Sequence, residues 1–361
     1  MCLIKILHIT SSFMPPKENG DLNYSQRSND DEGFYTGARV GGVSSVVDSM
    51  SSNLDIFEHH VLLSQGQNFN YGFWTGRKNI EIRDKLHIHY FPNSGDISKC
   101  KDVEYTFKGI LEKEYEDFSF DVIITHVVQP NMDLTGIDKK CKWINFTHGS
   151  PTNSNLSDIY MDMIDVNLLF SDWQKTKLKD NSKTTVIPFP VDTSVFYPRT
   201  DNPQNDFVWH GRIAPEKRII DFAVEFENSI NSNLFVVGGP DNINWKEDIE
   251  NSHLQKTHFL GRQFDEVLAQ TLSNHKYYVL MSEYETYCVG LLEALSAGCS
   301  VYAVYHPSLE WAKDLVCFVD TIDDLFEAIK NPTTNNNFQW VMDNMSWSKL
   351  RTDYENLIAL H

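Results

Sequence analysis

The sequence has no apolar run long enough to cross a lipid bilayer. Runs such as Tyr277–Met281 (YYVLM) fall far short of the roughly 20 residues that a spanning helix needs. The N-terminal MCLIKILHIT is short, is interrupted by Lys5 and precedes no small-residue cleavage site. That pattern predicts a first strand rather than a signal peptide. We therefore expect a soluble, cytoplasmic protein.

Cysteine is scarce and is spaced unlike a metal site or a disulfide framework. Six cysteines occur in 361 residues, with no CxxC pair among them. This spacing is typical of reduced, mostly buried thiols. We therefore expect neither zinc nor disulfide bridges.

Positive charge is also in short supply. The chain has 31 Lys and Arg against 50 Asp and Glu, a formal net charge of −19. Nucleic acids and anionic membranes are usually bound by clustered cations, so this charge argues against both as partners. Two lysine clusters, at 173–183 (WQKTKLKDNSK) and 139–142 (KKCK), are local exceptions that we interpret as solvated surface.

Short apolar, strand-like runs alternate with amphipathic, helix-like ones over most of the chain. This rhythm is typical of βα units around a parallel sheet. It pauses at the proline-rich segment 186–206, which predicts a linker between two such sheets. The predicted strands are 4–10, 59–64, 85–91, 121–128, 142–149 and 166–171 before the linker, and 206–211, 233–239, 256–261, 277–282, 299–305 and 315–320 after it.

Several candidate groups stand where predicted strands end. Open α/β sheets bind ligands at the carboxyl ends of their strands. Gly211-Arg212, Gly238-Gly239, His148-Gly149 and Glu285 each follow an apolar run. We therefore expect them at ligand-binding edges of the two sheets.

The segment 282–301 (SEYETYCVGLLEALSAGCSV) places two acids around the start of a helix. Glu285 is expected in the loop after a strand, and Glu293 on the helix that Gly298 ends. The first turn, around Cys288–Leu291, would present free N–H groups to a phosphate. Glu293 could then accept hydrogen bonds from ribose hydroxyls, and Glu285 could orient a sugar hydroxyl. The alternative for Glu293 is a structural pair with Lys or Arg.

The apolar face of that helix is predicted to be buried. Val289, Leu292 and Leu295 recur at helical spacing and would form the buried stripe.

Several motifs together resemble GT-B glycosyltransferases, in particular the large retaining family numbered four. The resemblance runs from about residue 4 to residue 357 and is more specific in the second half. The motifs are E-x7-E at 285–293, HGRIAPEKRI at 210–219, VIPFPVDTSVFYP at 186–198, FVVGGPD at 235–241, THFLGR at 257–262, NMSWSKL at 344–350, and ITSSFMPP with GGVSSVV near the N-terminus.

The resemblance implies an α/β fold of two Rossmann-like, doubly wound domains facing a cleft. Residues 1–190 would form the acceptor domain and 191–344 the nucleotide-sugar donor domain. A C-terminal helix at about 345–361 would pack back onto the first domain.

The resemblance also assigns the diphosphate of the donor to Arg212 and Lys217. An Arg fork and a Lys point charge suit a diphosphate, and they would stabilise the leaving group without a metal. Gly41 and Gly42, at the head of the first helix, would approach the same phosphates. Arg39 is a further candidate donor contact.

The remaining positions are assigned in the same way. Gly211, Cys288, Val289 and Gly290 join Glu293 in binding the donor, while His148 joins Arg212, Lys217 and Glu285 as a catalytic residue near the transferred sugar. His126 is a weaker candidate. No cofactor or metal is implied.

The implied reaction is retaining, metal-independent transfer from a nucleotide diphosphate sugar, expected to be a UDP-sugar, to an acceptor hydroxyl. A saccharide acceptor is expected, with DNA as an alternative. Three other functions stay open: a viral-type sugar transferase acting on hydroxymethylpyrimidines in DNA, a nucleotide-sugar epimerase of GT-B shape, and an inactive nucleotide-binding relative.

The sequence departs from the family in four places, one of which is VGGP at 237–240, one residue shorter than the usual G-x-G-P. Residues 285–288 read ETYC where the family usually has EGFG, so Thr286 and Cys288 replace glycines and could alter donor geometry. Phe189-Pro190 stands where Asn-Gly is usual. The polar segment 17–40 is unusually long, and we interpret it as an acceptor lid.

Overall fold

The computed structural model of the protein describes residues 3–10, 42–64, 78–83, 86–91, 111, 115–116, 119–126, 139–149, 162–240, 254–330 and 337–359. The chain divides into two compact units. Unit 1 comprises Met1–Ile187 and Arg351–His361, and unit 2 comprises Pro188–Leu350. Each unit is an α/β domain built on its own sheet.

The sheet of unit 1 has eight strands in the order β3-β4-β2-β1-β5-β6-β7-β8. All neighbouring strands are parallel except β3 and β4, which pair antiparallel. The strand order reverses at β1, so β1 and β5 flank the switch point of this doubly wound sheet. The strands are β1 (Lys5–Thr10), β2 (Glu58–Ser64), β3 (Lys78–Arg83), β4 (Leu86–Phe91), β5 (Val122–Thr125), β6 (Lys142–Phe146), β7 (Val166–Leu169) and β8 (Thr184–Val186).

Buried strands account for the core of unit 1. All four residues of β5 (VIIT) are buried, as a parallel strand covered on both faces requires. Helix α1 (Gly42–Asn53) packs on β1, and α4 (Asp172–Lys175) follows β7. Helix α11 (Trp347–Ala359) begins in unit 2 and continues into unit 1.

The sheet of unit 2 has six parallel strands in the order β11-β10-β9-β12-β13-β14. Counted from β9, this order is the Rossmann order 3-2-1-4-5-6. The switch point therefore lies between β9 and β12. The strands are β9 (Gln204–Ile213), β10 (Leu234–Pro240), β11 (Thr257–Gly261), β12 (His275–Leu280), β13 (Ser300–Ala303) and β14 (Val316–Phe318).

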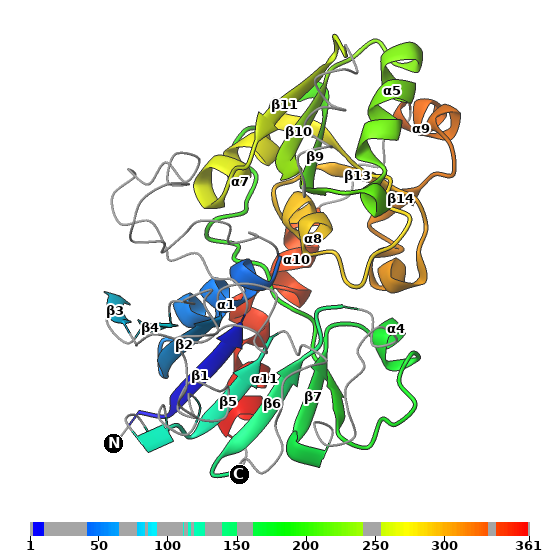
Figure 1. Ribbon diagram of the computed structural model, residues 1–361. Coiled ribbons are helices and arrows are strands. Elements are labelled where there is room, and N and C mark those ends of the chain that lie inside the picture. Colours follow the sequence, from blue (N-terminus) through cyan, green and yellow to red (C-terminus); the bar gives the residue numbers. More distant parts are fainter. Residues whose placement is uncertain are drawn as a thin grey trace, which may run out of the picture. The chain divides into compact units, whose positions relative to one another are not determined.

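Helices cover both faces of this sheet (Figure 1). Helices α5 and α9 pack against each other on one face, while α8 contacts both α7 and α10 on the opposite face. The elements are η3 (Pro215–Lys217), α5 (Ile219–Ser229), α7 (Asp265–Asn274), α8 (Val289–Ser296), η4 (Pro307–Ala312), α9 (Ile322–Lys330) and α10 (Asn337–Asn344).

The structure corrects several details predicted from the sequence. Strand β9 continues through Gly211 and Arg212, which were expected after its end. Gly238 and Gly239 likewise lie inside β10. Val289 is only half-buried, whereas Leu291 and Leu292 are fully buried. Strands β3 and β8 were not predicted; both are edge strands of the sheet, and β8 has only three residues.

Candidate active site

The candidate site of unit 2 lies at its switch point, where the carboxyl end of β9 meets the loop after β12. Side chains alternate along β9. Phe207 and Trp209 join the core cluster that includes Phe222 and Phe226 of α5. His210 and Arg212 therefore belong to the opposite face, the face that α8 covers.

His210 connects this strand to α8. Its Nε2 lies 2.7 Å from Oε2 of Glu293, 83 residues further along the chain. The Tyr278 hydroxyl donates to the carbonyl oxygen of His210 at 3.4 Å. A Cβ on Gly290 would lie 3.0 Å from His210 Nε2 and 3.4 Å from the Tyr278 hydroxyl oxygen. Glycine at 290 is therefore what lets α8 approach β9 so closely.

Lys217 and Glu285 are brought together directly. Lys217 Nζ donates to Oε1 of Glu285 at 2.7 Å, and both side chains are largely shielded from solvent. The backbone supports this contact, because Glu283 N donates to Glu216 O at 2.9 Å and so ties the loop after β12 to η3. The two predicted catalytic groups thus occupy one small site.

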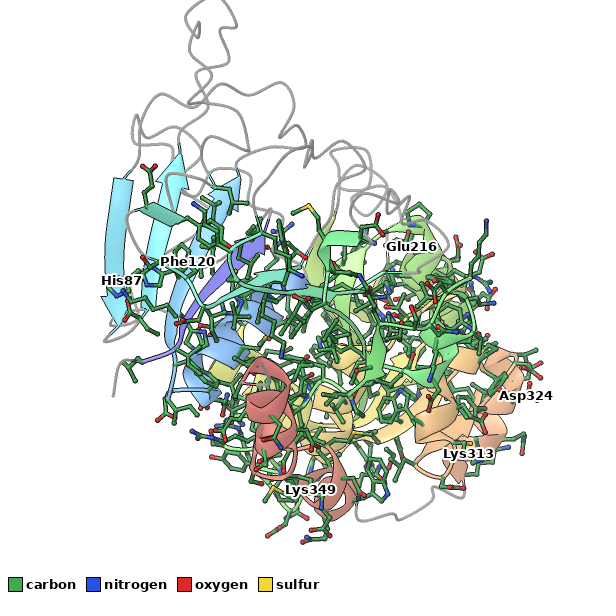
Figure 2. All side chains as sticks on the ribbon, turned by 90° about the horizontal axis from the view of Figure 1, so that it is seen from below. His87, Phe120, Glu216, Lys313, Asp324 and Lys349 are labelled. Atoms are coloured by element: carbon green, nitrogen blue, oxygen red, sulfur yellow. The ribbon has the colours of Figure 1, made fainter. Side chains whose placement is uncertain are left out.

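Arg212 forms an ion pair with Glu216, four residues further on. Both side chains are well exposed, at 45% for Arg212 and 36% for Glu216. An exposed pair of this kind is weak and is readily exchanged for another anion. Figure 2 labels Glu216.

Gly211 pairs with Gly238 of the neighbouring strand β10. A Cβ on Gly238 would lie 1.9 Å from the carbonyl oxygen of Gly211, closer than any side chain tolerates. These glycines therefore permit two backbones to approach beside the site.

The N-terminus of α8 begins in an unusual conformation. Cys288 is the N-cap and has φ 64° and ψ 74°, the left-handed region that glycine adopts most easily. Burial, reinforced by the nearby Glu285, raises the pKa of the Cys288 thiol, so the side chain stays uncharged. Within the described ranges, the N–H groups of Val289 and Gly290 have no hydrogen-bond acceptor. Such N–H groups at a helix start suit an anion.

His148 lies in unit 1, two residues beyond β6. Its loop is held by Gln174, whose Nε2 donates to the carbonyl oxygens of Thr147 at 2.8 Å and Gly149 at 3.1 Å. The buried Gln174 also accepts from the N–H groups of Phe170 and Ser171. Burial lowers the pKa of His148 to about 3, so the ring is neutral near pH 7.

The remaining predicted residues lie at or beyond the described ranges. Gly42 is the first residue of α1. Arg39, Gly41 and the predicted lid 17–40 fall outside the described residues.

The lysine clusters are partly engaged within unit 1. Lys183 Nζ donates to the carbonyl oxygens of Ile164 at 2.8 Å and Asp162 at 3.3 Å. Lys142 Nζ donates to the carbonyl oxygen of Leu357 at 2.6 Å. Lys142 and Lys183 thus have structural partners, whereas the sequence led us to interpret both clusters as solvated surface.

A separate cluster at the start of β2 and β4 brings Glu58, His60 and His87 within 4.8 Å of one another. Glu58 already accepts from His60 Nε2 at 2.8 Å, and Lys5 Nζ lies 3.9 Å from the same carboxylate oxygen. Because an ammonium stands beside the carboxylate, we assign this cluster to the ion-pair network of the sheet. Figure 2 labels His87.

Sequence reasoning missed His210 and Glu216, the partners of Glu293 and Arg212. Both stand inside the quoted segment 210–219. The role of His210 depends on the approach of α8 to β9, which a sheet order with β12 beside β9 brings about, whereas the Arg212–Glu216 pair is a local contact. Within the described ranges, no helix is both long and apolar enough to cross a membrane.

The fold is shared with solved glycosyltransferase structures over nearly the whole chain. A sucrose-phosphate synthase from Thermosynechococcus elongatus matches with a TM-score of 0.70 and 15% identity, covering 99% of this chain and 100% of that one. A glycosyltransferase from Rickettsia africae matches with a TM-score of 0.68 and 16% identity, covering 99% of each chain. Anabaena Alr3699/HepE, solved in complex with UDP and glucose, matches with a TM-score of 0.65 and 14% identity, covering 99% of this chain and 100% of its own.

Comparison with curated proteins by sequence finds no match. Residues 192–313 match the family model of glycosyl transferases group 1. That range contains β9, β12 and α8, and with them the whole candidate site of unit 2. Residues 192–313 therefore match group 1 glycosyl transferases within a chain that has the GT-B fold of the solved structures.

Proposed function

We propose that the protein transfers a sugar from a nucleotide diphosphate sugar to an acceptor hydroxyl, with retention of the anomeric configuration and without a divalent metal. The observation that carries this proposal is the cluster at the switch point of unit 2. There, Arg212 on β9 and Lys217 on η3 share one edge of the sheet with the first turn of α8. A diphosphate suits this set, because a guanidinium and an ammonium complement its charge and helix N–H groups bind its oxygens.

In the proposed reaction, the bond between the anomeric carbon and the diphosphate oxygen breaks, and the diphosphate leaves with the electron pair. Arg212 and Lys217 stabilise the charge that develops on it. The acceptor hydroxyl attacks from the same face, and its proton passes to an oxygen of the departing diphosphate. This route gives retention without a nucleophile from the protein.

Glu285 and Glu293 serve other purposes in this scheme. Retaining glycosidases use two carboxylates about 5 Å apart, one of them free to attack. Here Glu285 is bonded to Lys217 and Glu293 to His210. We therefore assign Glu285 to orienting the sugar and Glu293 to the ribose.

The charges of the site support an exchange of partners on binding. The ion-paired groups comprise two cations, Arg212 and Lys217, and the two carboxylates bonded to them, Glu216 and Glu285. The carboxylates hold the cations in place before the donor arrives. A bound diphosphate then replaces a carboxylate at Arg212, the more exposed of the two cations.

We propose a UDP-sugar as donor and a saccharide as acceptor, in line with the UDP and glucose named for the Anabaena neighbour. We also place the reaction in the cytoplasm, because sparse cysteines that are spaced unlike a disulfide framework suit a reducing compartment.

The test is incubation with UDP-, GDP- and ADP-sugars and saccharide acceptors in EDTA, followed by NMR of the products. We expect a nucleoside diphosphate and a glycoside with the donor's anomeric configuration. A new nucleotide sugar without nucleoside diphosphate would indicate an epimerase. Turnover that is lost in EDTA and restored by magnesium would contradict metal independence.

A further inference from the structure

Four histidine rings form an unbroken hydrogen-bonded chain in unit 1, which we call the histidine row. His59 Nδ1 lies 2.9 Å from His8 Nε2, and His8 Nδ1 lies 2.9 Å from His126 Nε2. His126 Nδ1 then lies 3.1 Å from His148 Nε2. The row starts in β2, crosses the switch point between β1 and β5, and ends just beyond β6.

The sheet register explains why these four side chains meet. His59 is in register with Ile6, two residues from His8, so both rings stand on one face. Ile9 is in register with Thr125, which places His126 on that same face. Thr125 is in register with Asn145 of β6. His148 lies three residues after Asn145, an odd number, so its ring falls on the same face as that of His126.

The three inner rings of the row are buried and stacked. His8, His59 and His126 are at most 1% exposed. The His8 ring stacks on those of His59 and His126, each with centroids 5.2 Å apart. Burial lowers the pKa of His8 and His126 well below the usual value, and that of His148 to about 3. Near pH 7 these rings are neutral, and a neutral imidazole carries one N–H.

One backbone carbonyl fixes the direction of the whole row. His59 Nε2 lies 3.0 Å from the oxygen of Leu54, which can only accept, so Nε2 carries the hydrogen. With the single ring N–H of a neutral His59 on Nε2, its Nδ1 accepts from His8 Nε2–H. Repeating this step, His8 accepts from His126, and His126 accepts from His148. His148 therefore donates from Nε2, and its Nδ1 carries the lone pair.

We propose that the histidine row is a positioning device that holds His148 as the neutral Nε2–H tautomer, so that Nδ1 accepts a hydrogen bond from a sugar hydroxyl. The tautomer follows from unit 1 alone, whereas the sugar contact rests on the proposed function. If the row binds one more proton and all three ring-to-ring hydrogen bonds are kept, His148 Nδ1 carries a hydrogen. This holds whichever of the four rings is charged. Burial opposes that addition and keeps Nδ1 an acceptor.

NMR of the protein labelled with ¹⁵N-histidine tests the tautomer directly, because the two ring nitrogens differ in shift when only one is protonated. At pH 7 we expect all four rings of the row to be neutral Nε2–H tautomers. An Nδ1–H or imidazolium form of His148 would overturn the inference.

Two variants separate positioning from general packing. His59→Phe removes the anchor to Leu54, so His148 should become a mixture of tautomers and kcat should fall about 10-fold, with the donor KM little changed. His60→Phe is the matched control, because His60 is the next residue of β2, equally buried and on the opposite face. It should leave the His148 spectrum and kcat as in the wild type. Equal effects of the two variants would contradict the positioning role.

If His59→Phe does not fold, His126→Gln provides the second test. Its amide donates and accepts as the imidazole does, so the tautomer of His148 should be kept, and a change to Nδ1–H would overturn the inference. Because the spectrum is recorded without substrate, it tests the tautomer independently of the proposed function. If the tautomers are as predicted but the protein transfers no sugar, only the proposed function is contradicted.

Discussion

Lys217 Nζ donates a hydrogen bond of 2.7 Å to Glu285 Oε1, joining two residues 68 positions apart in the chain. The contact links η3, just after β9, to the loop after β12, and it therefore spans the switch point of unit 2. In the proposed function, an ammonium held in this way is already oriented when the diphosphate arrives. Such preorganisation lowers the cost of binding and of stabilising developing charge.

Neutralising Glu216 should strengthen nucleotide binding. In Glu216→Gln, a neutral amide replaces the carboxylate that competes with the diphosphate for Arg212. Because exposed ion pairs contribute only about 0.5 kcal/mol, we expect a Kd lower by about 2-fold to 3-fold in calorimetry. Glu310→Gln, which removes the partner of the exposed Lys313, is the control and should leave Kd unchanged. A weaker affinity in Glu216→Gln would show that the carboxylate itself helps to hold the donor.

Replacing Cys288 by glycine should stabilise unit 2. A residue with a side chain in the left-handed region costs about 1–2 kcal/mol, part of which glycine loses again through greater freedom in the unfolded chain. We expect a net gain of about 1 kcal/mol in the free energy of unfolding, measured by urea denaturation. Cys288→Ala keeps the Cβ and should bring no such gain. Equal stability of the two variants would rule out backbone strain at this position.

Removing the amide of Gln174 should loosen the loop that carries His148. Gln174→Leu leaves the carbonyl of Thr147 and the N–H of Phe170 without their partner in a buried setting. We expect a loss of about 3 kcal/mol in the free energy of unfolding, together with a lower kcat. Gln270→Leu, on the exposed side of α7, should change neither quantity. An unaffected kcat in a clearly destabilised Gln174→Leu would separate this loop from catalysis.

The stability of unit 1 should fall as the pH falls below about 6.5. Burial lowers the pKa of His8 and His126 in the folded state. Below the unfolded value of 6.5, the unfolded chain therefore takes up protons that the folded chain does not. Each ring should contribute a loss of about 1.4 kcal/mol per pH unit, down to its lowered folded pKa. Urea denaturation at pH 7, 6 and 5 measures this slope.

His8→Phe is the matched variant for that measurement. It removes one buried titrating ring from the row, so the slope should decrease by about 1.4 kcal/mol per pH unit. An unchanged slope in His8→Phe would show that other groups govern the acid sensitivity of unit 1.

Much of the fold could be predicted from the sequence, because parallel strands buried on both faces appear as short apolar runs. The run at 121–128, for example, contains β5. Strand ends were harder to predict. β9 extends through Gly211 and Arg212 because β10 offers glycines at the matching register positions, and a single strand's sequence does not reveal its neighbour.

The candidate site, too, could be predicted from the sequence only in part. Lys217 and Glu285 were assigned to one site through the resemblance of their motifs to those of GT-B glycosyltransferases, and their side chains are in contact. The contact between His210 and Glu293 could not, because it depends on β9 lying beside β12. The histidine row was equally hidden, since its members come from four separate segments joined only by register.

Calorimetric titration of UDP, GDP and ADP in EDTA tests the central claim most directly. The wild-type protein should bind at least one of them, and Lys217→Met should weaken that binding by about 10-fold to 100-fold through loss of a charge-assisted contact. Lys313→Met, at an exposed position labelled in Figure 2, should bind like the wild type. Equal affinities of Lys217→Met and Lys313→Met, or no binding by the wild type, would contradict the account.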